Sequence, residues 1–258
     1  VIALASCNGK LTSLVPDTPS KAPNYFCTWN TQGYAVSYSG SDMMRSAMTE
    51  ENILGKGQYQ NWVSFFPKIR EDLYFVMDDS WDIPRNENSA NRNPYLGKCE
   101  LDEGRFPSFR GTATERLDQL TKRIKQEGWK GAGGWICAQK AEGHEHQSEE
   151  EYWTERLKVA NEAGLSYWKV DWGHQDRNEG WRRMLTRLGK KYAPNLWIEH
   201  AMHGHFIRFS DVFRTYDVEN IIAQPLTIRR VVELLPHKNE GKSKGIINCE
   251  DEPYIAVG

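Results

Sequence analysis

Carboxylates follow the apolar runs of this chain, one run after another. Asp78 and Asp79 come directly after the run 73–77, and Asp171 comes directly after the run 166–170. The run 196–200 ends in Glu199 and His200, and later runs are followed by Asp217 and Glu219 and by Glu250 and Asp251. Carboxylates that share one site repel each other and raise one another's pKa. Such a set suits a reaction that needs one ionised and one protonated carboxyl, as glycoside hydrolysis does.

Lys169 stands two residues before Asp171, so both side chains point to the same side of a strand. An ammonium group beside a carboxylate favours its ionised form, which a nucleophile must have. The pattern therefore predicts that Lys169 keeps Asp171 ionised. The alternative is a buried ion pair that serves only the core.

The apolar runs read as short strands, because they are rich in Val, Ile, Tyr, Phe and Trp. Seven strands are predicted, at 25–28, 73–77, 133–138, 166–170, 196–200, 212–215 and 245–249. Helices are predicted between most of them, at 112–127, 148–163, 180–192 and 226–235. Thr112 with Glu115, and Ser148 with Glu151, have the spacing of a capping box at a helix start.

Alternation of strands and helices predicts a parallel sheet, and this number of units predicts a (β/α)8 TIM-type barrel. About seven βα units are present, so we expect the barrel to be incomplete at its C-terminal side. Catalytic groups of such barrels lie at the carboxyl ends of the strands, where the carboxylates of this chain fall.

Composition narrows the function classes. The chain has 258 residues and a formal net charge of -2, which gives no broad basic surface for nucleic acid. It has 10 Trp and 11 Tyr, which suits stacking against the apolar faces of sugars but is also common in the core of a large barrel. The expected partner is an oligosaccharide or polysaccharide substrate.

Cys7 ends an apolar run that resembles the tail of a bacterial lipoprotein signal. We expect residues 1–24 to be a signal remnant and polar tether, with lipid on Cys7, and residues 25–258 to be the catalytic barrel. The membrane would then be reached only through this anchor, and the domain would lie in the bacterial cell envelope or be secreted. A short first strand is the alternative interpretation. The other four cysteines could oxidise outside the cytoplasm.

Six segments in order resemble the α-galactosidase families of retaining glycoside hydrolases, family 27 most closely and family 36 next. They are Thr28-Trp29-Asn30-Thr31, Asp78-Asp79-Ser80-Trp81, the loop 102–107, Lys169-Val170-Asp171, Arg214 with Asp217, and the final Ala256-Val257-Gly258. The resemblance runs from about Tyr25 to Gly258. It implies Asp171 as nucleophile and Asp217 as acid/base, with Glu219 as the second candidate.

The same resemblance implies a set of substrate-binding residues and no metal or organic cofactor. The set is Trp29, Asp78, Asp79, Trp135, Lys169, Glu199, His200 and Arg214, with Trp135 as either a pocket wall or a core residue.

Departures from the family pattern leave the sugar open. Arg214 and Asp217 are three residues apart where family 27 usually has four, and the segments after the fifth and seventh strands differ. The alternatives are a β-L-arabinopyranoside, an α-N-acetylgalactosaminide or an α-glucan as substrate, or a surface lipoprotein that binds glycans without cleaving them. A metal-dependent hydrolase is a third alternative. Histidines 144, 146, 200, 203 and 205 could be ligands, but solvated loop histidines are the expectation.

Overall fold

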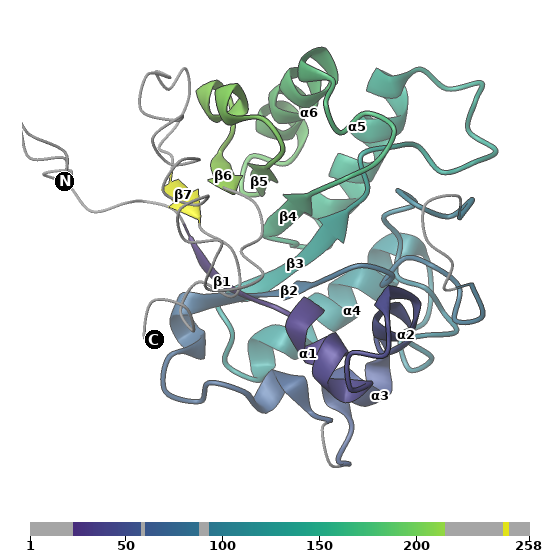
Figure 1. Cartoon of the computed structure of the whole chain (residues 1–258), viewed down its shortest axis with the longest axis vertical. Coiled ribbons are helices and arrows are strands. Elements are labelled where there is room, and N and C mark those ends of the chain that lie inside the picture. Colours follow the sequence, from purple (N-terminus) through teal and green to yellow (C-terminus); the bar gives the residue numbers. More distant parts are fainter. Residues whose placement is uncertain (1–22, 58–59, 88–92, 215–244, 248–258) are drawn as a thin grey trace, which may run out of the picture.

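Seven parallel strands form one curled sheet and pair in the order in which they occur along the chain (Figure 1). The computed structural model describes residues 23–57, 60–87, 93–214 and 245–247. The strands are β1 (Asn24–Cys27), β2 (Leu73–Met77), β3 (Gly131–Ile136), β4 (Tyr167–Val170), β5 (Trp197–His200), β6 (Val212–Arg214) and β7 (Gly245–Ile247). Parallel strands in sequential order, separated by helices, are the arrangement of a TIM-type barrel. The predicted fold class is therefore confirmed.

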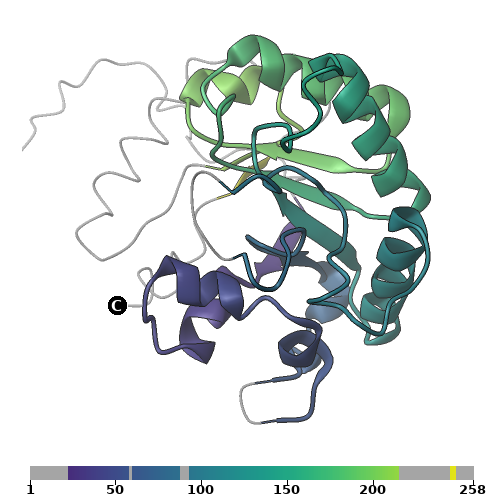
Figure 2. The same cartoon turned by 90° about the vertical axis from the view of Figure 1, so that its right-hand side faces the viewer.

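Three long helices cover the outer face of the sheet (Figure 2). They are α4 (Ala113–Gln126), α5 (Glu149–Glu162) and α6 (Glu179–Tyr192). The connection from β1 to β2 holds the shorter α1 (Trp29–Ala35), α2 (Ser41–Ser46) and α3 (Glu50–Leu54), with 3-10 turns at Trp62–Ser64 and Arg70–Asp72. A further turn, Gly204–Arg208, follows β5. Within the described ranges, no helix has the length and apolar character needed to cross a membrane.

All seven predicted strands are present, and the bounds of most differ by one or two residues from those predicted. The largest shift is at β3, which was predicted at 133–138 and begins with Gly131 instead. Gly131 and Ala132 pair with Tyr74 and Phe75 of β2, so backbone pairing extends the strand where glycine gives no sequence signal. The predicted helix at 226–235 lies outside the described residues. The short helices of the β1–β2 connection were not predicted.

Alternate residues of each strand face opposite sides of the sheet. One side packs against the helices and contributes Phe75, Met77, Trp168, Val170 and Ile198 to the large core. The other side faces the inside of the curve, where a second apolar cluster forms a mainly aromatic layer, called the aromatic layer below. Its members are Tyr25, Tyr74, Val76, Tyr167, Trp197 and Val212. The next inward-facing residue of each strand, one step toward the carboxyl end, is the place where the polar side chains collect.

Candidate active site

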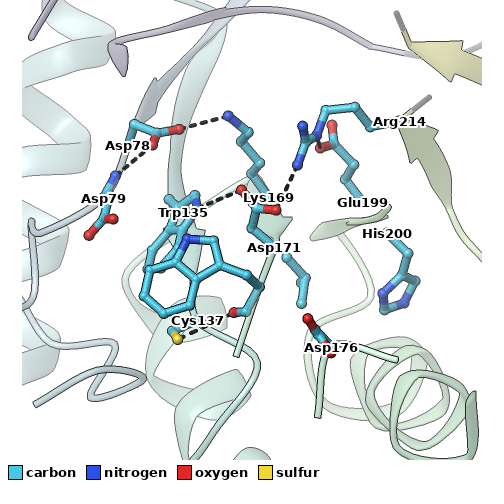
Figure 3. A network of polar contacts seen from close by, with 12 residues as sticks. Asp78, Asp79, Trp135, Cys137, Lys169, Asp171, Asp176, Glu199, His200 and Arg214 are labelled. Carbon is cyan, nitrogen blue, oxygen red and sulfur yellow. Dashed lines mark hydrogen bonds and ion pairs between the residues drawn. The ribbon is translucent and has the colours of Figure 1, made fainter. Parts of the chain in front are cut away.

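Six consecutive strands each place one side chain in the layer above the aromatic layer. These side chains are Cys27, Asp78, Trp135, Lys169, Glu199 and Arg214. Register explains their meeting, because Trp135 is paired with Lys169 and Lys169 with Glu199 across the sheet. Asp171 directly follows β4, two residues beyond Lys169, and lies at the centre of this group (Figure 3).

Both oxygens of the Asp171 carboxylate are held by neighbours. Oδ2 accepts a hydrogen bond from the indole Nε1 of Trp135 at 3.1 Å, and Oδ1 forms an ion pair with Nη2 of Arg214 at 3.0 Å. The Asp171 side chain is 13% exposed, whereas Lys169 and Asp78 are each 4% exposed and Arg214 and Glu199 are fully buried. Asp171 is therefore the carboxylate of this charged group that a solute can most readily reach.

The charges around Asp171 favour its ionised form. Burial acts to raise the pKa of this carboxyl, but Arg214, Lys169 and the bond from Trp135 outweigh it and hold the pKa below its usual value. A carboxylate that has a lowered pKa and remains partly exposed is suited to nucleophilic attack.

Glu199 has the opposite character. Its Oε1 accepts from Nε of Arg214 at 3.0 Å, and its Oε2 accepts a hydrogen bond from the hydroxyl of Tyr167. Burial raises the pKa of Glu199 even though Arg214 and Lys169 act to lower it. Arg214 thus bridges two carboxylates, and Tyr167 fixes the more deeply buried one. Tyr167 was not singled out in the sequence, since its position in a strand marks it equally well as core.

Lys169 contacts Asp78 and Cys27, which belong to β1 and the end of β2. Its Nζ donates to Oδ2 of Asp78 at 2.8 Å and contacts the Cys27 sulfur at 3.3 Å, and the Cys27 thiol donates to the same Asp78 oxygen at 2.9 Å. The other oxygen of Asp78 accepts the backbone N–H of Asp79 at 2.8 Å. Asp78 therefore has a fixed orientation. Cys27 was not predicted to take part.

Asp79 lies at the same edge of the barrel and pairs with a different basic side chain, Arg45. Its Oδ2 accepts from Nε of Arg45 at 2.8 Å, and its Oδ1 accepts from the hydroxyl of Ser80 at 3.0 Å. Burial is the largest influence and raises the pKa of Asp79 to about 6, although Arg45 acts against it. Arg45 comes from α2 in the β1–β2 connection, and no motif in the sequence marked it.

Two predicted site residues are not brought into this group. His200 is fully buried and points toward α6: its Nδ1 lies 3.2 Å from Nη1 of Arg182, and its Nε2 lies 2.8 Å from the hydroxyl of Thr186. It follows Glu199 in β5 and so faces the other side of the sheet. Trp29 begins α1, partly buried, and takes no part in the contacts that define the group.

Several predicted groups fall outside the described residues. They are Asp217, Glu219 and Cys7. Among the cysteines that are described, Cys27, Cys99 and Cys137 are buried and form no disulfide. The described part of the chain has no cluster of three or more His, Cys, Asp or Glu side chains arranged to hold a metal ion.

Solved structures share the fold of this chain, although comparisons of its sequence find no relative. No protein-family model matches the sequence, and no curated protein matches it. Among solved structures, a GH27 β-L-arabinopyranosidase from Geobacillus stearothermophilus, solved with arabinose, superposes with a TM-score of 0.50 at 14% identity. The alignment covers 72% of this chain and 54% of that one. The chain therefore has the fold of a GH27 barrel, as the sequence resemblance predicted.

Two further structures superpose with lower TM-scores. A candidate α-galactosidase from Bacteroides fragilis gives a TM-score of 0.49 at 16% identity, over 77% of this chain and 39% of that one. The α-galactosidase I from Mortierella vinacea gives 0.44 at 15% identity, over 78% and 48%. The chain thus spans between about two fifths and just over half of the length of these proteins.

Proposed function

We propose that this chain is the catalytic barrel of a retaining glycoside hydrolase that removes terminal α-galactosyl or closely related sugars. Asp171 is the nucleophile. The observation that carries the proposal is the environment of Asp171. Its pKa is held below the usual value, its carboxylate is oriented through both oxygens, and it is more exposed than the charged groups around it. The GH27 fold supports it, since barrels place their chemistry at this edge.

In the proposed reaction, an oxygen of Asp171 bonds to the anomeric carbon while the bond from that carbon to the leaving oxygen breaks. Asp217 gives its proton to the leaving oxygen and then takes one from the water that hydrolyses the glycosyl-enzyme. Trp135 and Arg214 hold the attacking carboxylate in place. Orientation of this kind lowers the barrier because the reacting groups are already positioned.

The remaining polar groups would recognise the sugar. Asp78 and Asp79 would accept hydrogen bonds from hydroxyl groups and Lys169 would donate one, beside the contacts that they already make. Glu199 is fully buried and would act by holding Arg214 in place. Trp135, with Trp29 at the edge, would contact an apolar ring face. A β-L-arabinopyranoside has the ring of an α-D-galactoside without its exocyclic CH2OH, so both belong to the expected substrate class. His200 lies on the other face of the sheet, so it would contribute only by positioning Arg182. The guanidinium of Arg182 donates to the backbone carbonyls of Val170 and Asp171.

The test is hydrolysis of p-nitrophenyl α-D-galactopyranoside and p-nitrophenyl β-L-arabinopyranoside by the chain and by Asp171→Ala. We expect turnover of at least one substrate and a loss of about 10^4-fold or more in kcat for the variant, as for removal of other catalytic nucleophiles. Added azide should restore turnover by attacking from the vacated face, giving a glycosyl azide of inverted configuration.

A chain that binds these sugars but turns over neither would contradict the hydrolase. That result would favour the non-catalytic glycan-binding lipoprotein. A chelator that abolished turnover would favour the metal-dependent hydrolase.

Glycosides with different leaving groups can show whether Asp217 or Glu219 is the acid/base. Removal of the true acid/base should slow glycosides with a poor leaving group by about 10^2–10^4-fold, because their oxygen needs the proton. A nitrophenolate leaves without one, so the first step on that substrate should change much less. We expect Asp217→Ala to show this difference and Glu219→Ala to serve as the matched control. The reverse result would assign the role to Glu219.

A further inference from the structure

A cavity of about 470 Å³ opens on the outer, helical side of the barrel, beside α6 (Figure 1). Five of its lining residues belong to α6, and the sixth, Phe209, lies in the connection from β5 to β6. The volume is within the range of about 300–1,000 Å³ that small-molecule sites have. The lining shares no residue with the Asp171 group, which lies on the inner side of the sheet.

The side of α6 at this cavity is uncovered because the connection from β5 to β6 contains no long helix. The connections that lead to β3, β4 and β5 each hold a helix of 14 residues. The connection 201–211 holds only the 3-10 turn Gly204–Arg208. On its other side α6 packs against α5, where Trp181 and Trp153 have ring centroids 5.3 Å apart. In a TIM barrel a neighbouring helix usually covers the side that is open here.

The uncovered side of α6 is basic, not apolar. Arg183, Arg187, Lys190 and Lys191 line the cavity, and the lining contains no acidic residue. They follow one another at spacings of three and four residues, which places them on one face of the helix. The whole helix has five basic residues and one acidic residue, whereas the chain carries a net charge of -2. This concentration of positive charge favours an anionic ligand over an apolar helix.

Aromatic stacking orders one of these cations. The guanidinium of Arg183 lies 4.5 Å from the centroid of the Phe209 ring. Phe209 is only 6% exposed and packs on His200, with ring centroids 5.6 Å apart. A guanidinium can stack through its face and still donate from its edge to an oxyanion. A side chain that is already ordered loses less entropy when a ligand binds.

The two arginines and the two lysines differ in their partners. Arg183 pairs with Glu179 at 2.7 Å and Arg187 with Glu150 at 2.9 Å, and both carboxylates lie outside the lining. Exposed pairs of this kind contribute little, so an anion can compete for the arginines. The described part of the chain provides no carboxylate partner for Lys190 or Lys191. A ligand with two negative charges would match these two ammonium groups.

Stabilisation of the helix end explains only part of this pattern. Lys190 and Lys191 lie in the last turn of α6, where positive charge interacts favourably with the helix dipole. This effect falls off within one turn. It therefore does not account for Arg183 and Arg187, which precede the last turn and face the same cavity.

We propose that this cavity binds the phosphate monoester group of a small, soluble molecule. Such a group carries nearly two negative charges at neutral pH and three strong acceptor oxygens. Arginine donates to these oxygens in pairs, and lysine adds compact positive charge. The proposal is independent of the proposed glycosidase activity, because it concerns the outer side of α6.

The test is calorimetric titration of the whole chain with inorganic phosphate and with glycerol 3-phosphate at constant ionic strength. We expect both to bind, and the double variant Lys190→Gln/Lys191→Gln to bind about 10-fold more weakly, since each exposed charge contributes a few-fold. Arg187→Gln should weaken binding about 2–5-fold. The matched control is Lys122→Gln/Lys125→Gln, which removes the same charge from exposed positions of α4 and should stay within twofold.

Equal weakening in the control would mean that phosphate responds only to the net charge of the chain, and would overturn the site. Absence of heat with both ligands, together with an unchanged melting temperature in phosphate, would also overturn it. Co-sedimentation with phosphatidylcholine vesicles that contain phosphatidic acid provides a further arm. Binding to these vesicles without binding of the soluble phosphates would contradict a small-molecule site.

Discussion

Asp82 is a buried carboxyl at the carboxyl edge of the barrel, four residues after Asp78. It is 1% exposed, its Oδ2 accepts the backbone N–H of Cys99 at 2.9 Å, and within the described residues its Oδ1 has no partner. Burial is the largest influence and raises the pKa of Asp82 to about 7, with a further contribution from the charge of Asp79. This carboxyl therefore holds its proton in the folded chain at a pH where the unfolded chain has lost it.

The contribution of Asp82 to the free energy of unfolding should accordingly fall as the pH rises. At this carboxyl the folded chain binds more protons than the unfolded chain between about pH 4 and pH 7, so its contribution is greatest below this window and is lost through it. Asp79, with its pKa raised to about 6, acts in the same direction. We expect Asp82→Asn to gain about 2–4 kcal/mol relative to the unsubstituted chain between pH 4 and pH 8.

Urea unfolding at several pH values measures this difference. The amide keeps an acceptor for Cys99 and does not titrate, which is why the loss should be smaller. Asp72→Asn, at an exposed position, is the control and should follow the unsubstituted chain. Parallel curves for Asp82→Asn and the unsubstituted chain would contradict the buried, protonated carboxyl.

At the level of single residues, the sequence predicts the charged side chains that lie at the ends of strands. It does not predict those that reach the site from other elements. Lys169 and Asp171 could be assigned to one side of a strand by counting alone. Arg45 could not, because it reaches Asp79 from α2, 34 residues away in the chain. His200 illustrates the reverse: adjacency to Glu199 suggested a shared role, whereas strand alternation points the two side chains to opposite faces.

Two of the outer helices begin with complete capping boxes. The Thr112 side chain accepts the N–H of Glu115 at 3.3 Å, and the Glu115 side chain accepts the N–H of Thr112 at 2.8 Å. Ser148 and Glu151 repeat the arrangement at 3.2 and 2.9 Å. Each box satisfies N–H groups that the first turn of a helix otherwise leaves without partners.

Thr112→Ala and Ser148→Ala should each lower the free energy of unfolding by about 1 kcal/mol, the usual cost of losing such a cap. Because the two helices begin at separate places, the losses should add in the double variant. Thr154→Ala, inside α5, is the control and should not destabilise, since alanine favours the helix interior. Urea midpoints provide the measurement, and an unchanged midpoint for both cap variants would contradict the assignment.

Elements with strong local signals were the ones that could be predicted. The start of α4 and of α5 follows from the cap spacing, and the strands follow from their apolar runs. The helices of the β1–β2 connection are five to seven residues long, so they are held by their contacts with the sheet and carry little periodicity of their own.

At the scale of the whole molecule, the segment around Cys7 bears on where the protein is located. We propose that Cys7 carries a lipid, on the strength of the apolar run that precedes it in the sequence. In bacterial expression with the natural leader, the protein should sediment with membranes and Cys7→Ser should be found in the soluble fraction. Cys99→Ser, at a buried thiol, is a control for the loss of any cysteine. Equal fractionation of all three would contradict the anchor.

The contacts that build the candidate active site also impose an order on its formation. Lys169 lies 91 residues from Asp78 and 142 from Cys27 along the chain, and the polar group is complete only when β1, β2 and β4 lie in one sheet. Contacts this distant in sequence are slow to form, because long loops must close first. During synthesis, the residues on β1 and β2 therefore lack their partner until β4 has emerged. The proposed enzymatic activity should be among the last properties that a refolding chain regains.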